Sequence, residues 1–210
     1  MGIVKNRLIE CAEREWRYFG GSTRNIENQW NIVGDEADEP FRSHISHYWA
    51  SVGKPDWNGG TDEPWSAAFI SWCFKIAGAG SGFSGDATHS VYINRIRLGD
   101  GMDPRLTLRS PPNTPLRVGD LIWNSRSDGQ DENIPRSLAE ATARLAAGDF
   151  FISHVDIVVA VGQGRCDSIG GNVSNLDVGG SVTKSTWRLD DQGCLSDPRK
   201  PWIGVVRNDL

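Results

Sequence analysis

One serine of this chain stands where a helix is expected to begin, a setting that favours a nucleophile. Ser66 follows Pro64 in the segment TDEPWSAAFISWCFKIAG, and the apolar residues after it repeat at helical spacing. The first turn of a helix carries unpaired backbone N–H groups and the positive end of the helix dipole, which stabilise negative charge developing on a side-chain oxygen. A serine that merely helps to satisfy the helix N-terminus is the alternative. The sequence therefore predicts either a nucleophile or a capping residue here.

A histidine and an aspartate interrupt a strongly apolar segment later in the chain. His154 and Asp156 lie in FISHVDIVVAVG, and both point to one face because side chains alternate along a strand. A histidine close to a serine nucleophile can act as its general base. A buried histidine satisfied by a backbone carbonyl is one alternative. Another is that His154 and Asp156, with His89 or Asp86, bind a divalent metal ion that activates water.

The strand expected next ends in IGGNVSN, with two glycines directly before Asn172. An asparagine can hold the ring N–H of a histidine and so fix which ring nitrogen takes a proton. A turn asparagine is the alternative. The order along the chain, with a nucleophile on a helix, a base on a strand and an orienting amide on the following strand, predicts a catalytic group of Ser66, His154 and Asn172.

The elements that must position these residues fall into two parts of the chain. Hydrophobic periodicity predicts helices first and strands from about residue 118, which favours an α+β fold with a mainly antiparallel sheet. A polar segment with a short alanine-rich helix, at about 125–149, reads as an insertion between the first two strands. The expected helices span residues 3–19, 40–52, 65–77 and 88–98, and the expected strands are VGDLIW, FFISHVDIVVAVG, RCDSIGG, SVTKSTWRL and WIGVVRN.

Length and charge limit the classes of protein to be considered. A chain of 210 residues fits one domain, for which we expect an N-terminal helical region at 1–60 and a core at 61–210. The net charge is −5 and the basic residues are scattered singly, which argues against a nucleic-acid partner. The amphipathic N-terminal segment predicts neither a signal peptide nor a membrane span, and so predicts synthesis in the cytoplasm.

The cysteines show no spacing typical of a structural zinc site. Cys11, Cys73, Cys166 and Cys194 are far apart in the sequence, and none forms a C-x-x-C motif. Cys73 lies within an apolar helix and reads as a core residue. Cys166 and Cys194 can pair only if their segments are neighbours in the fold.

Four segments, in order, resemble the motifs of the NlpC/P60 and CHAP superfamily of papain-like cell-wall hydrolases. They are EPWSAAFISWCFKIAG, PLRVGDLIW, SHVDIVVAVG and IGGNVSN, within about residues 61–175. The resemblance implies a papain-like NlpC/P60 fold whose nucleophile, base and third polar residue correspond to Ser66, His154 and Asn172. Most relatives have cysteine where this chain has serine, so the resemblance points to a branch with Ser66 in place of that cysteine. We expect substrate contacts from Trp65, His89 and Asp156.

The resemblance also implies a reaction and a place of action. It predicts hydrolysis of an amide bond in bacterial peptidoglycan peptide, without a cofactor or metal ion. It further suggests an antibacterial effector that acts in the periplasm or cell wall after specialised secretion, with an immunity protein or secretion-system component as a further partner. Because a serine hydroxyl has a far higher pKa than a thiol, a weak or inactive cell-wall peptide or glycan binding module is the main alternative. A metal-dependent hydrolase using His154 and Asp156 is the other.

Overall fold

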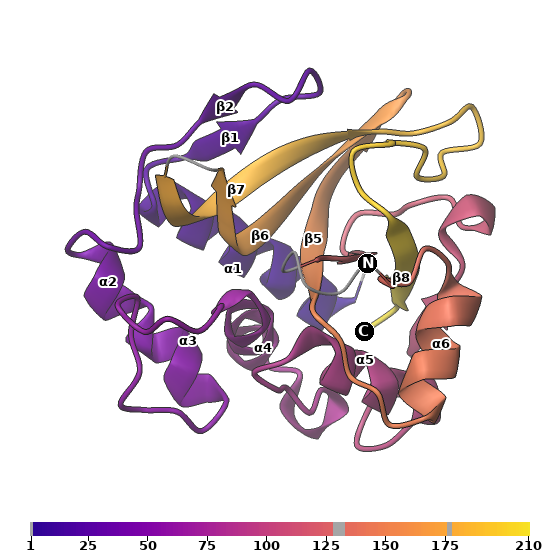
Figure 1. The fold of residues 1–210 in the computed structure, drawn as a ribbon, viewed down its shortest axis with the longest axis horizontal. Helices are drawn as coiled ribbons and strands as arrows, with labels where there is room; N and C mark the ends of the chain where they lie inside the picture. Colours follow the sequence, from indigo (N-terminus) through magenta and orange to yellow (C-terminus); the bar gives the residue numbers. More distant parts are fainter. Residues whose placement is uncertain (1, 128–132, 176–177) are drawn as a thin grey trace.

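The strands form one mixed sheet around which the helices are arranged (Figure 1). The computed structural model describes residues 2–127, 133–175 and 178–210. In these residues the sheet has eight strands in the order β2-β1-β7-β6-β5-β4-β8-β3, and every neighbouring pair is antiparallel except β1 with β7. The strands are β1 (Ser22–Arg24), β2 (Trp30–Asn31), β3 (Leu106–Arg109), β4 (Leu121–Ser125), β5 (Ser153–Gly162), β6 (Arg165–Asn175), β7 (Val178–Arg188) and β8 (Trp202–Asn208).

Two helices cover one face of this sheet and build the main core with it. Helix α4 packs on β5 and β6, and α1 packs beside α4 (Figure 1). Helix α4 is apolar on nearly every side, as a helix enclosed by other elements must be. The described helices are α1 (Ile3–Tyr18), α2 (Phe41–His44), α3 (Ser46–Ser51), α4 (Ser66–Ala77), α5 (His89–Leu98) and α6 (Leu138–Ala146), with 3-10 turns η1 (Gly80–Gly82) and η2 (Pro111–Asn113).

The alternation of side chains along β5 separates the main core from a polar face. Val155 and Ile157 are fully buried in the main core, which also holds α1 and α4. Val158 belongs to a second, smaller hydrophobic cluster that includes Trp187. The strand therefore turns His154 and Asp156 away from the main core, at the end where β5 begins.

The predicted α+β class is confirmed, with differences in detail. The helices expected at 3–19, 65–77 and 88–98 are α1, α4 and α5, whereas the segment 40–52 forms two shorter helices, α2 and α3. The N-terminal region at 1–60 is not only helical, since it also contributes β1 and β2 to the sheet. These strands and β3 have two to four residues each, too few to show a periodic pattern. The insertion at 125–149 contains α6, although residues 128–132 lie outside the described part.

All four cysteines are free and buried, so Cys166 and Cys194 do not form a disulfide. Burial raises the pKa of the Cys73 thiol well above its ordinary value, as expected for a core cysteine. In the described ranges, no helix has the length and apolar character needed to cross a membrane.

Candidate active site

Ser66 is the first residue of α4, and its hydroxyl is hydrogen-bonded to a histidine rather than to a backbone N–H group of the helix terminus. Its Oγ lies 2.7 Å from Nε2 of His89, and only 3% of the residue is exposed. The preceding residue, Trp65, forms the N-cap without a side-chain cap. The first backbone bond here joins Phe69 N to Trp65 O at 2.9 Å, so the earlier N–H groups of the first turn stand ahead of the helical ladder. The contact with His89 therefore replaces the capping interpretation.

His89 is held between Ser66 and a tyrosine one turn further along α5. Nδ1 of His89 lies 2.5 Å from the hydroxyl of Tyr92, and both residues are buried. Burial is the main cause that lowers the pKa of His89 well below its ordinary value, with His154 and Arg126 adding to it. Burial also raises the pKa of Tyr92 well above its ordinary value. At neutral pH the imidazole is therefore uncharged and the phenol keeps its proton.

The direction of these two hydrogen bonds follows from the donors that must be satisfied. His89 Nδ1 is the hydrogen-bond partner found for the Tyr92 hydroxyl within the described residues. If Tyr92 O–H donates to Nδ1, no buried donor of this pair is left over. His89 then carries its proton on Nε2 and donates it to Ser66 Oγ. We assign this tautomer, which leaves the Ser66 proton available to an acceptor.

His154 is held by a carboxylate instead. Its Nε2 lies 2.7 Å from Oδ1 of Asp156, and the hydroxyl of Ser168 donates to the other carboxylate oxygen at 2.8 Å. Trp187 Nε1 in turn donates to Ser168 Oγ at 2.8 Å. Burial alone raises the pKa of Asp156, but His154 and the Ser168 hydrogen bond outweigh it and hold the pKa below its ordinary value. The carboxylate is therefore ionised and fixes the His154 proton on Nε2.

The second nitrogen of His154 is a buried acceptor without a partner. Nδ1 has no hydrogen bond to any described residue. The rings of His89 and His154 stand edge to face, with centroids 5.6 Å apart. Burial lowers the pKa of His154, while Asp156 opposes that shift through its charge and its hydrogen bond. Ser66 makes no hydrogen bond to His154 in this structure; His89 lies against both.

Asn172 does not take the orienting role expected of it. Asp156, two residues along the same strand, already accepts the His154 ring N–H. The Asn172 side chain instead donates to Glu36 at 3.1 Å, and its backbone has a positive φ of 54°. The register of β6 against β7 shifts between Gly170 and Val173, at the point where Asn172 lies. This local irregularity gives Asn172 a place in the Glu36 contact rather than in the histidine contact.

Trp65, which we expected to contact substrate, is fully buried and belongs to the main core. Its indole N–H donates to the same Glu36 carboxylate, which also accepts the backbone N–H of Gly180 at 2.7 Å. A side chain at Gly171 would meet the Trp65 ring at 2.6 Å, so this glycine is required for α4 to approach β6. Trp65 therefore positions the start of α4 and does not form a substrate surface.

Several residues of the site were not predicted. Tyr92 stands three residues after His89 on one helix, a spacing that places both on the same face and that could have been noticed. Ser168 reaches Asp156 only through the pairing of β6 with β5, and Glu36 lies in the segment before α2. Neither carries a signal in its own sequence neighbourhood.

The groups considered for a metal site do not converge. Among the described residues no cluster of three or more His, Cys, Asp or Glu side chains could hold a metal ion. Asp86 pairs with Arg95 at 3.2 Å. The ring nitrogens of His89 are occupied by Ser66 and Tyr92. The arrangement offers His154 and Asp156 alone, which is fewer than the three protein ligands typical of a catalytic zinc site.

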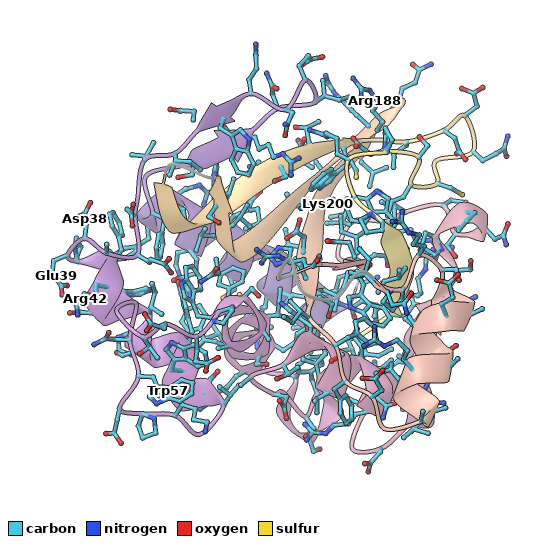
Figure 2. All side chains as sticks on the ribbon, viewed as in Figure 1. Asp38, Glu39, Arg42, Trp57, Arg188 and Lys200 are labelled. Carbon is cyan, nitrogen blue, oxygen red and sulfur yellow. The ribbon has the colours of Figure 1, made fainter. Side chains whose placement is uncertain are left out.

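His89 and His154 each line a different cavity of about 400 Å³. Ser66 and His89 line the first, whose walls include Trp57. His154 lines the second, whose walls include Lys200. Figure 2 labels Trp57 beside α3 and Lys200 near the strands, in well separated parts of the molecule. The two rings contact each other but line different cavities.

Comparison with known proteins gives a family without an assigned activity. Residues 18–208 match the family model described as "Uncharacterized protein conserved in bacteria (DUF2272)". No curated protein and no solved structure matches the chain.

Proposed function

We propose that this chain, which belongs to the DUF2272 family, is a serine hydrolase that cleaves an amide bond in bacterial cell-wall peptide. The observation that carries the proposal is the position of Ser66 Oγ, 2.7 Å from His89 Nε2 at the first residue of α4. A ring N–H and the helix N–H groups beside Ser66 Oγ both favour negative charge that develops at this position during nucleophilic attack.

His154 acts as the general base in this proposal. Ser66 Oγ accepts from His89, so its own proton needs an acceptor, and His154 Nδ1 is an acceptor for which the described part of the chain supplies no donor. Asp156 keeps the proton of His154 on Nε2 and stabilises the imidazolium that forms. The contact between Ser66 and His154 must shorten in the reacting complex, as catalytic hydrogen bonds often do when substrate binds.

The chemistry then follows the acyl-transfer route. Ser66 Oγ forms a bond to the carbonyl carbon of the amide while its proton passes to His154 Nδ1. The N–H of His89 and the backbone N–H groups at the start of α4 stabilise the oxyanion. His154 gives the proton to the leaving nitrogen as the C–N bond breaks, which leaves an acyl-serine. Water hydrolyses this ester, with His154 again taking and returning the proton.

The choice of substrate rests on the four sequence segments that resemble papain-like cell-wall hydrolases. Those segments contribute α4, β4, β5 and β6, which surround the site. This resemblance supports the proposal of a papain-like NlpC/P60 relative, with peptidoglycan as its partner and Ser66 in the cysteine position. We extend the proposal to an antibacterial effector that acts in the periplasm or cell wall, paired with an immunity protein.

The activity is tested by incubating purified protein with peptidoglycan and measuring new amino and carboxyl termini. Ser66→Ala is expected to reduce their release at least about a thousandfold, because it removes the nucleophile. Ser71→Ala is the matched control, since Ser71 lies on the same helix and its hydroxyl contacts the backbone of Asp86 rather than a histidine. Equal activity of wild type and Ser66→Ala would contradict the proposal.

The effector role has a separate test. Expression in a bacterium with a periplasmic targeting sequence is expected to stop growth, and expression without it is not. The Ser66→Ala variant should relieve the toxicity. Equal growth of the targeted and untargeted strains would count against this role while leaving the hydrolase proposal intact.

A binding module is the second candidate, favoured by the closed state of the site. Ser66 and His89 are 3% and 4% exposed, which leaves little of either accessible to a substrate before the site opens. Such a module would be retained on peptidoglycan and release no new termini under any condition. The same incubation therefore separates the two candidates.

A further inference from the structure

The cavity beside His154 collects positive charge in a protein whose net charge is −5. Arg24 comes from β1, Arg126 follows β4 and Lys200 precedes β8, and all three line this cavity. None of the three forms an ion pair with any described residue. Asp156 is the carboxylate in the cavity lining, and its oxygens are already bonded to His154 and Ser168. The cavity therefore holds more cationic than anionic charge.

Arg24 is built into the wall of the cavity. Its exposure is 7%, and its guanidinium carbon lies 4.8 Å from the ring centres of both Trp30 and Trp187. Its Nε donates to Asn28 at 2.7 Å, and no hydrogen bond of its two terminal nitrogens is found among the described residues. Two tryptophan rings thus hold the Arg24 guanidinium in place, and its terminal N–H groups can donate to a ligand. This geometry suits a planar anion such as a carboxylate.

Arg126 and Lys200 are also partly buried without hydrogen-bonded side-chain partners among the residues described. Burial, followed by the repulsion of Arg24 and Arg126, lowers the pKa of Lys200 to about 8. Burial likewise lowers the pKa of the Arg126 guanidinium. Grouped cations that repel one another in a partly desolvated cavity are stabilised when an anion enters.

We propose that this cavity binds a side-chain carboxylate of the substrate, and so makes the protein selective for acidic peptides. The proposal rests on the proposed function, because His154, the general base of that function, lines this cavity. Its volume of about 400 Å³ lies in the range of cavities that hold small ligands. The lining also includes Trp30 and Trp187, whose rings offer a peptide apolar contacts that a free inorganic ion does not use.

The test measures binding to the full-length Ser66→Ala variant, which does not consume the probe. The probes are a blocked Ala-Glu-Ala tripeptide, its Ala-Gln-Ala counterpart and inorganic phosphate, followed by calorimetry or by tryptophan fluorescence. The glutamate peptide is expected to bind at least about tenfold more tightly than the glutamine peptide, since a buried charged hydrogen bond is lost in the latter. Phosphate should compete only weakly.

Variants of the cavity locate the binding. Arg126→Met and Lys200→Met, added separately, should each reduce the preference for glutamate at least about threefold. Arg188→Met is the matched control, because Arg188 is exposed at the end of β7 and does not line the cavity (Figure 2). Thermal unfolding of each variant identifies any that fails to fold. The cavity variant that does fold is then compared with wild type and with Arg188→Met.

The outcomes separate this proposal from the hydrolase proposal. Equal binding of the two peptides, or a preference that survives both cavity substitutions, would overturn the acidic-peptide site. Phosphate binding without glutamate-peptide binding would also overturn it, in favour of a free-anion site. If the protein prefers the glutamate peptide but releases no new termini from peptidoglycan, the acidic-peptide site is supported and the hydrolase proposal is contradicted.

Discussion

The two histidines of the site differ in what holds them. Both are buried, and each has one ring nitrogen within 2.7 Å of a fixing group. The partner of His89 is an uncharged phenol, so nothing opposes the effect of burial on its pKa. The partner of His154 is an ionised carboxylate, which offsets part of that effect. His89 is the histidine hydrogen-bonded to Ser66, so distance alone would make it the general base. We assign that role to His154 because its partner, Asp156, is charged and stabilises the imidazolium.

This difference assigns the two rings to different tasks. A neutral imidazole with a strongly lowered pKa is a poor proton acceptor but remains a good hydrogen-bond donor. His89 therefore suits the stabilisation of an oxyanion. His154, whose positive form is stabilised by Asp156, suits proton transfer. Substituting the partner of one histidine at a time tests which of the two rings accepts the Ser66 proton.

Removing the charge that supports His154 should have the largest effect. Asp156→Asn is expected to lower kcat at least about a hundredfold, because the imidazolium loses its stabilising charge and the ring can adopt the wrong tautomer. Steady-state release of new termini measures it. Asp167→Asn is the matched control, since the Asp167 carboxylate on neighbouring β6 accepts a hydrogen bond from Thr186 rather than from a histidine. A kcat within twofold of wild type would mean that His154 is not the base.

Removing the phenol that holds His89 should have a smaller effect. Tyr92→Phe leaves the ring in place but removes the donor to Nδ1, which frees His89 to change tautomer. We expect kcat to fall roughly tenfold, within the range for loss of one supporting hydrogen bond. Tyr48→Phe is the control, because its buried hydroxyl donates to Glu15 rather than to a histidine of the site. If Tyr92→Phe costs more than Asp156→Asn, the roles of the two histidines are reversed.

The pH dependence of the rate should show a small shift in a defined direction. The base must be neutral, and burial lowers the pKa of His154 from its ordinary value of 6.5. The rate should therefore fall on acidification with a midpoint below pH 6.5. Asp156 raises this pKa, so residual activity of Asp156→Asn should show a midpoint at still lower pH. A midpoint above 6.5, or a shift to higher pH in the variant, would contradict the assignment.

Local patterns predicted those parts of the site that lie within single elements. The start of α4 at Ser66 follows from proline and an apolar helical repeat, and the shared face of His154 and Asp156 follows from strand alternation. The α+β class and the order of the later strands follow from the same periodicities. These features depend on short segments whose geometry their own residues determine.

The contacts between elements could not be predicted in the same way. Asn172 was expected at His154, but the shifted register at Gly170 places its amide on Glu36, from a segment far away in the chain. Ser168 reaches Asp156 through strand pairing alone. The cations of the second cavity come from three distant segments, and no local pattern brings them together.

The most direct measurement of the central claim is covalent labelling of Ser66 by a fluorophosphonate reagent, which reacts with activated serine hydroxyls. Digestion and mass spectrometry should locate one adduct per chain on Ser66. Labelling should slow at least about tenfold in Asp156→Asn, because the base that activates the hydroxyl is weakened. Absence of an adduct on Ser66 in the folded wild-type protein, or a rate that does not change in Asp156→Asn, would contradict the account.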